Sequence, residues 1–176
     1  MSRPRQPDPA QLVLSVLSSR WEEFWPGLKD TLEPRLGEID YLGDPLPFDH
    51  THYYNKEFGT PLLRRLMGFA PLTPQDTLPE IKLWCYDLEQ RHADSRGQRL
   101  FNLDPGLLTQ ERLVLATGKN YTHRVYLGQG IWGDLTLIFQ NGKWRDQPWT
   151  FPDYASPELQ EHLTRLRTRY REKIGL

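Results

Sequence analysis

Apolar runs alternate with polar stretches of helical character along the first part of the chain. Residues 11–19, QLVLSVLSS, are rich in Leu and Val and predict a buried first strand. Residues 19–37 start with a Ser and early acidic residues and end on a Gly, which predicts a helix that Pro26 and Pro34 kink. Residues 38–48 alternate weakly between apolar and polar positions and predict a second strand.

The middle of the chain predicts two further strands and a long helix. Residues 60–67, TPLLRRLM, predict a short helical piece, and residues 68–73, GFAPLT, a third strand. Residues 73–93 predict a second long helix, because five apolar residues share one helical face: Leu78, Ile81, Trp84, Cys85 and Leu88. Residues 98–106, QRLFNLDPG, predict a fourth strand that ends in a turn.

The last third of the chain has the strongest local signals. Residues 123–144 predict strands joined first by GQG and then by NG, a hairpin signal. Residues 156–175 predict a closing helix with Ser156 as its cap and Pro157 in its first turn. One face of this helix is apolar, and its Arg-rich remainder is typical of a solvated surface. The residues of the apolar face are Leu159, Leu163, Leu166 and Tyr170.

This order of elements predicts an α+β fold: a split βαβ, ferredoxin-like sheet extended by a C-terminal β-hairpin and a C-terminal helix. In that topology the second and fourth strands run in the same direction. We therefore expect their ends, which carry PFDHTHYY and NLDPG, to emerge at one edge of the domain.

Composition narrows the class of protein. A chain of 176 residues is most simply one domain, here residues 11–176 after a polar, Pro-rich and flexible leader at residues 1–10. A net charge of −1 argues against a general nucleic-acid binder. No apolar run approaches the roughly 20 residues of a membrane span, and the start has no signal-peptide pattern. With its single Cys, the chain is expected to be a cytoplasmic protein without an intrachain disulfide.

The stretch PFDHTHYYNKEFG is the densest group of reactive side chains. Asp49, His52 and Glu57 offer oxygen and nitrogen donors for acid–base chemistry or a metal. Tyr53 and Tyr54 offer hydroxyls and ring faces to a planar ligand. The competing interpretation is a polar loop whose acids cap turns and whose tyrosines cover the edge of the core.

Two later stretches add candidate ligand contacts. Asn102 and Asp104 lie two residues apart and hence on one face of a strand, although Asp-Pro-Gly is also typical turn chemistry. Lys119, His123 and Arg124 could hold a phosphate or carboxylate, or could simply be exposed or paired with acids.

An aromatic, Pro-stiffened loop follows. Trp149, Phe151 and Tyr154 in PWTFPDY could stack on a base or cover the core.

The chain resembles a prokaryotic family catalogued as domain of unknown function 4416 over nearly its whole length after the leader. The resemblance implies no established activity. Its members are sometimes described as GTP-binding, but this chain has no G-x-x-x-x-G-K-[ST] motif, and it carries Cys85 and Tyr86 where the family usually has Thr and Asn. The stretches that carry the resemblance are PFD-T-YY--E-G, PEIKL, NLDPG, LVLAT-K, HRVYLGQGI and PWTFPDY.

Together these residues predict a protein that binds a small anionic ligand, phosphorylated or nucleotide-like, in a polar cleft at one end of the sheet. Asp49, His52 and Asp104 are candidate ligands for a divalent metal. If the protein is an enzyme, metal-assisted phosphoryl or phosphoester chemistry fits this mixture. The alternatives are an RNA-binding module, which the neutral net charge disfavours, and a protein-interaction or structural protein without a ligand.

Overall fold

The computed structural model describes residues 3–176. In this range the chain forms an antiparallel sheet of nine strands with four α-helices and one 3-10 turn. The strands are β1 (Ala10–Ser18), β2 (Ile39–Leu42), β3 (Leu46–Pro47), β4 (Leu63–Thr73), β5 (Asn102–Leu108), β6 (Arg112–Thr117), β7 (Arg124–Gly128), β8 (Ile131–Gln140) and β9 (Lys143–Asp146). The helical elements are α1 (Trp21–Leu36), α2 (Asn55–Phe58), η1 (Gln75–Thr77), α3 (Leu78–Arg91) and α4 (Pro157–Lys173).

The strand order is β2-β4-β1-β5-β6-β8-β7, with β3 also paired to β4 and β9 to β8. Because β4 and β5 both run antiparallel to the β1 strand between them, they are parallel to each other, and α3 connects them. This is one split βαβ connection inside a larger sheet. The mixed α and β class is confirmed, whereas a complete ferredoxin-like sheet is not.

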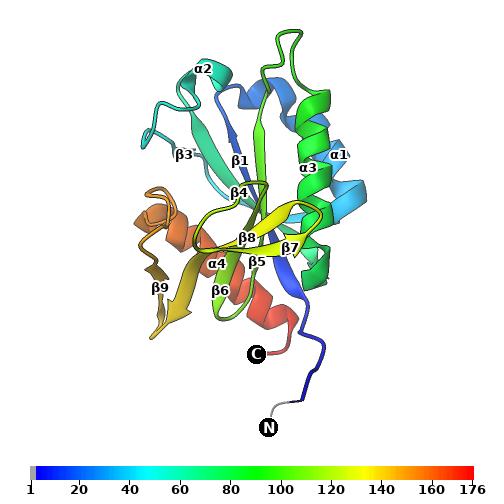
Figure 1. Ribbon diagram of the computed structural model, residues 1–176, viewed down its shortest axis with the longest axis vertical. Helices are drawn as coiled ribbons and strands as arrows, with labels where there is room; N and C mark the ends of the chain where they lie inside the picture. Colours follow the sequence, from blue (N-terminus) through cyan, green and yellow to red (C-terminus); the bar gives the residue numbers. More distant parts are fainter. Residues whose placement is uncertain (1–2) are drawn as a thin grey trace.

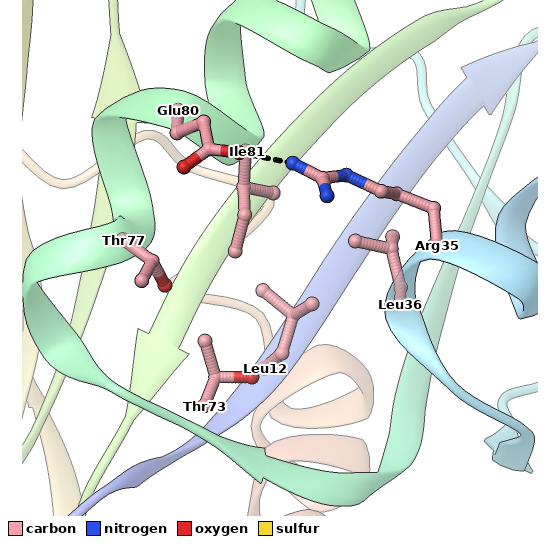
Figure 2. A pocket seen from close by; sticks show the side chains of 7 residues that line it. All are labelled: Leu12, Arg35, Leu36, Thr73, Thr77, Glu80 and Ile81. Atoms are coloured by element: carbon pink, nitrogen blue, oxygen red, sulfur yellow. Dashed lines mark hydrogen bonds and ion pairs between the residues drawn. The ribbon is translucent and has the colours of Figure 1, made fainter.

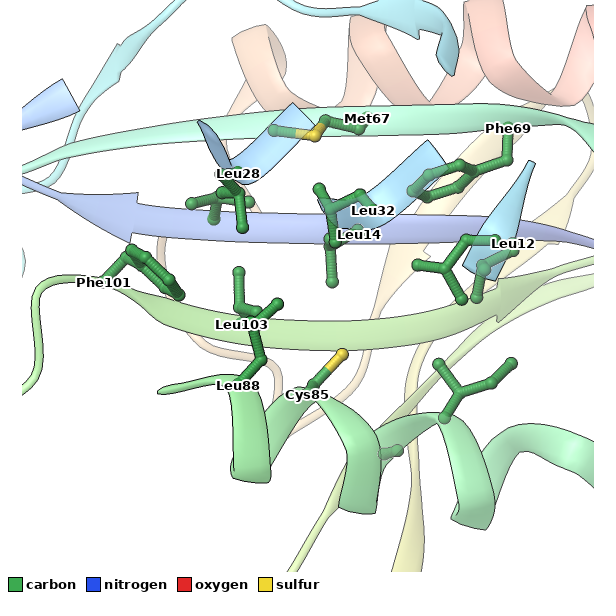
Figure 3. Close-up of a cluster of buried hydrophobic side chains, with 14 of the residues drawn as sticks. Leu12, Leu14, Leu28, Leu32, Met67, Phe69, Cys85, Leu88, Phe101 and Leu103 are labelled. Carbon is green, nitrogen blue, oxygen red and sulfur yellow. The ribbon is translucent and has the colours of Figure 1, made fainter. Parts of the chain in front are cut away.

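Helices cover both faces of the sheet: α1 and α3 lie on one face and α4 on the other (Figure 1). Every residue of β1 is buried, and its sequence is accordingly apolar except for Gln11, Ser15 and Ser18. Leu12 and Leu14 of β1 face α1 and α3, where Cys85 lies in the core as predicted (Figure 3). Val13 faces the opposite way, toward α4.

The C-terminal part follows its sequence signals closely. The hairpin turns at GQG and NG join β7 to β8 and β8 to β9, and the turn residues Gln129 and Asn141 both have positive φ. Ser156 caps α4, since its hydroxyl accepts a hydrogen bond from the Leu159 N–H at 3.3 Å. The predicted apolar face of α4 is buried against the sheet.

The prediction of a short helix at residues 60–67 is wrong, because residues 63–67 belong to strand β4. A short helix, α2, is present but lies earlier in the chain. The buried positions in the first part of β4 alternate, which is the strand period, but one of them is occupied by Arg64. A buried arginine therefore concealed the strand pattern in the sequence.

The turn predicted at NLDPG is also wrong. Asn102–Leu108 form strand β5, with Asp104 opposite Ser15 in β1. The expectation that the second and fourth predicted strands run in the same direction fails as well, because β2 and β3 run antiparallel to β5 through the pairings with β4 and β1. The end of β3 and the beginning of β5 nevertheless lie at the same end of the sheet.

The predicted leader is described only in part. Residues 1–2 lie outside the described residues, residues 3–9 are exposed without helix or strand, and β1 begins at Ala10.

Candidate functional site

Three loops come together on the face of the sheet that α4 covers, near the end where β1 finishes and β5 begins (Figure 1). They are residues 48–54 after β3, residues 118–123 after β6, and residues 147–156 before α4. Each contributes residues that the sequence predicted as site residues, so the fold gathers several of them from distant parts of the chain.

Side-chain contacts join these loops in pairs. The Lys119 ammonium lies 5.8 Å from the centre of the Tyr53 ring, which joins the first loop to the second. The imidazole of His123 stacks on Trp149 with ring centres 4.7 Å apart, which joins the second loop to the third. The first and third loops meet at a buried arginine.

That arginine is Arg64. We use the name Arg64 cluster for Arg64 and the residues that contact its guanidinium: Ser15, Phe48, Asp153 and Tyr154. The Arg64 Nε lies 2.6 Å from Asp153 Oδ2, and its guanidinium also donates a hydrogen bond to Ser15. The guanidinium carbon lies 4.9 Å from the ring centre of Phe48 and 5.2 Å from that of Tyr154. A buried guanidinium requires such a counter-charge because desolvation of an unpaired cation is costly.

Asp104 lies on β5 opposite Ser15, next to this cluster. Its Oδ1 accepts a hydrogen bond from Lys82 Nζ at 2.9 Å, and its Oδ2 accepts one from Asn102 Nδ2 at 2.7 Å. Burial would raise the pKa of Asp104, but the charges of Lys82 and Arg64 outweigh it and hold the pKa below its usual value. The carboxylate is therefore ionised, and its side chain remains 31% exposed.

Glu57 is paired with an arginine that also braces the start of β5. Arg99 contacts both Glu57 oxygens, through Nε at 2.6 Å and Nη2 at 2.8 Å, and its Nη1 donates to Glu89 and to Asn102. Hydrogen bonds from Arg99 lower the pKa of Glu57. This bidentate pair ties α2 to the loop before β5, so the contacts of Glu57 are those of a structural residue.

A second polar group surrounds Asp134 on β8. Its Oδ2 lies 3.1 Å from His123 Nε2 and accepts a hydrogen bond from Arg124 Nε at 2.9 Å. Thr136 and Trp149 bond to neighbouring backbone carbonyls. The cation of Arg124 is therefore already paired within the protein.

Apart from Arg64 Nε and Asp153 Oδ2, which form an ion pair, two buried polar atoms beneath the loops have no hydrogen-bond partner among the described residues: the Tyr154 hydroxyl and His123 Nδ1. Burial raises the pKa of Tyr154, so the hydroxyl keeps its proton. A buried donor or acceptor without a partner costs free energy, and such atoms commonly bind ordered water or a ligand group.

Exposed aromatic rings border the same region, and we call Tyr53, Tyr121 and Trp149 the aromatic rim. Their exposed fractions are 71%, 64% and 37%, and the Tyr121 ring centre lies 5.5 Å from that of His123. Tyr54, by contrast, is half-buried, and burial together with the Asp104 charge raises its pKa.

Not all predicted residues gather here. Asp49 and His52 are exposed, and within residues 3–176 neither forms a hydrogen bond or ion pair with the Arg64 cluster, although His52 contacts Asn55. In that same range no three His, Cys, Asp or Glu side chains lie close enough to hold a metal ion. Asp49, His52 and Asp104 therefore do not form a three-ligand metal site.

Sequence reasoning missed four buried members of this region: Arg64, Lys82, Asp153 and Tyr154 as a partner of Arg64. Three of them lie within PEIKL and PWTFPDY, stretches that carry the family resemblance. Arg64 had no sequence signal, because a single buried arginine looks like any surface arginine.

Among the helices of the described residues, none is both long and apolar enough to cross a membrane.

One of three comparisons with known proteins found a match. Neither the curated proteins nor the solved structures contain a match to this chain. A protein-family comparison does match, over residues 8–170, which is nearly the whole sequence. The chain therefore belongs to the family described as Domain of unknown function (DUF4416).

Proposed function

We propose that the protein binds a small ligand that combines a planar ring with an anionic group, as a nucleotide or another phosphorylated aromatic molecule does. The ring would stack on the aromatic rim, and the anion would contact Lys119. The observation that carries the proposal is the position of Lys119: a cation next to an exposed aromatic ring, at the junction of the loops.

Lys119 differs from the other cations of this region. Arg64, Lys82 and Arg124 each contact a carboxylate of the protein itself. Among the described residues Lys119 makes no ion pair, and its ammonium is available to a ligand anion. An anion can bind there without breaking a pair that the fold needs, which favours ligand binding at this cation over the others.

The aromatic rim supplies the second requirement. Three large rings are exposed in this region, and one of them, Tyr53, lies next to the Lys119 cation. A planar ligand ring would cover their faces, and stacking of this kind contributes about 1 to 3 kcal/mol per base in nucleic-acid complexes. Among residues 3–176 no three His, Cys, Asp or Glu side chains could hold a metal ion, so the ligand contacts would be those of the aromatic rim and Lys119.

RNA is the weaker candidate for the same rings. Three of the four arginines of α4 that would give a basic surface are engaged: Arg165 binds Glu161, Arg167 donates to the Gln110 carbonyl, and Arg169 pairs with Asp40. Single-stranded RNA binding depends on free cations along a surface as well as on stacking. A small ligand needs only one, which is what Lys119 offers.

The test is calorimetric titration of the full chain with AMP, ATP, adenosine and inorganic phosphate. We expect AMP or ATP to bind, and adenosine and phosphate alone to bind more weakly because each supplies only half of the contacts. Lys119→Gln should weaken AMP binding about tenfold or more, as loss of a charged hydrogen bond does.

Lys143→Gln is the matched control, because Lys143 is an exposed lysine of the β8–β9 hairpin. Its binding should equal that of the wild type. Failure of every nucleotide to bind, or equal losses in the Lys119 and Lys143 variants, would contradict the proposal. A mixed-sequence RNA that binds in a Lys119-dependent manner while AMP does not would favour the alternative.

A further inference from the structure

A pocket of about 240 Å³ lies at the opposite end of β1 and on the other face of the sheet, between the end of α1 and the start of α3. It contains none of the residues that the sequence predicted for a site. Leu12, Leu36 and Ile81 form apolar walls that come from a strand and two helices (Figure 2). The pocket is smaller than the roughly 300 to 1,000 Å³ of sites for drug-sized molecules, so its ligand must be small.

An ion pair lies at the edge of this pocket. Arg35, in the last turn of α1, donates to Glu80 in the first turn of α3, and the two side chains meet beside Ile81 (Figure 2). Both side chains are about half exposed. Exposed pairs of this kind contribute about 1 kcal/mol or less, so Glu80 can leave Arg35 at little cost.

A hydroxyl without a partner lines the same pocket. Thr73, at the end of β4, is only 9% exposed, and its hydroxyl forms no hydrogen bond with any residue in the described part of the chain. The Thr73 oxygen is not one of the fully buried polar atoms that lack a partner, so it is open to the pocket and to water there. A polar atom of a ligand inside the pocket would supply that partner.

We propose that this pocket binds a small monocarboxylate with an apolar tail. The tail would pack on Leu12, Leu36 and Ile81, and the carboxylate would replace Glu80 on the Arg35 guanidinium while accepting a hydrogen bond from Thr73. This proposal does not rest on the ligand proposed for Lys119.

A carboxylate suits the pocket better than an amine does. The planar guanidinium of Arg35 offers two parallel donors that match the two oxygens of a carboxylate. The start of α3 also borders the pocket through Glu80 and Ile81, and the positive end of a helix dipole favours an anion. An amine would instead have to bind Glu80 while its own charge faced this helix end.

The experiment compares hexanoate, hexylamine and hexanol by titration of the full chain, followed by NMR shifts of the Leu and Ile methyl groups. Hexanoate should bind and shift the methyl groups of Leu12, Leu36 and Ile81, and the amine should not. Arg35→Gln should weaken hexanoate binding about tenfold or more, and Thr73→Val about fivefold. Glu80→Gln should strengthen it, because it removes the competing carboxylate.

Lys29→Gln is the control: it removes another exposed cation of α1, one that pairs with Glu33 away from the pocket. It should leave hexanoate binding unchanged. The proposal is overturned if hexanoate does not bind the wild type, if hexylamine binds as tightly, or if Arg35→Gln binds hexanoate as the wild type does. Melting temperatures of each variant show whether it is folded, and Glu80→Gln gives a gain that misfolding cannot imitate.

Discussion

Lys82 of α3 holds the Asp104 carboxylate of β5 at 2.9 Å and donates to the Leu103 carbonyl at 2.8 Å. Strand β6 pairs with β5 only from Gly106 onward, so this stretch of β5 has no strand on that side. The Glu89 carboxylate of the same helix accepts a hydrogen bond from the Leu103 N–H at 2.6 Å. Side chains of a helix thus satisfy the backbone groups that a neighbouring strand would otherwise pair with.

Asp104→Asn should destabilise the protein by about 2 kcal/mol or more. The amide keeps a hydrogen-bond acceptor for Lys82 but removes the charge that neutralises this almost buried ammonium, and an uncompensated buried charge is costly. Chemical unfolding in urea measures the loss. Asp30→Asn, at an exposed aspartate of α1, should change stability by less than about 0.5 kcal/mol. Equal effects of the two substitutions would contradict the structural role of the Asp104 pair.

The stability lost in Asp104→Asn should depend on pH. The pKa of Asp104 in the folded protein lies below its usual value, so its contribution is complete above the pKa of the unfolded chain and is lost as the pH falls through the folded pKa. The difference between wild type and Asp104→Asn should be constant from about pH 7 to 5 and shrink below about pH 4. Unfolding curves of both proteins at each pH test this. A difference that grows on acidification would show that Asp104 is not held ionised.

Gly106→Ala should destabilise the β5–β6 pair. A Cβ at this position would lie 2.7 Å from a Leu115 methyl and 2.9 Å from the Val114 carbonyl oxygen, and the latter belongs to the backbone and cannot turn aside. The strands would have to separate, and overpacking of this kind costs about 1 to 3 kcal/mol. Gly118→Ala is the control, since no heavy atom lies within 4 Å of a Cβ there. If urea unfolding gave the two variants the same stability, the close approach at Gly106 would be unimportant.

Pro105 and Gly106 show why the sequence misled at NLDPG. Proline followed by glycine is a strong turn signal, yet both residues lie inside β5. The N–H and C=O of Leu103 point away from β1, toward α3. The residue two positions later in a strand points its N–H to the same side, and here that residue is Pro105. Proline has none, and the β5–β6 ladder does not extend to it. Only the tertiary arrangement makes these residues acceptable in a strand.

Local patterns, by contrast, predicted the elements that depend on neighbours in the sequence. The turns at GQG and NG, the Ser156 cap and the apolar face of α4 need no information from the rest of the chain, and all are present. The candidate site depends on long-range contacts. The sequence suggested Tyr53, Lys119, His123 and Trp149 separately, but not that they would join three loops over a buried arginine.

Cys85 should resist thiol reagents as long as the protein is folded. It is fully buried among the core residues of α3, and this burial raises the pKa of its thiol to about 12 despite the nearby Lys82. At pH 8 the thiolate is therefore scarce and inaccessible, and labelling requires opening of the core. Because Cys85 is the only cysteine of the chain, the reaction with Ellman's reagent reports on this site alone.

The control is a chain with Ser95→Cys in a Cys85→Ser background, which places the thiol in the exposed loop after α3. We expect Cys85 to react about five thousandfold more slowly than this exposed thiol in native buffer, or more slowly still, since opening a stable core costs about 5 kcal/mol or more. In concentrated guanidinium chloride the two should react at similar rates. Rapid labelling of Cys85 in native buffer would instead show that α3 detaches readily, and then its side chains could not hold β5 through Lys82 and Glu89.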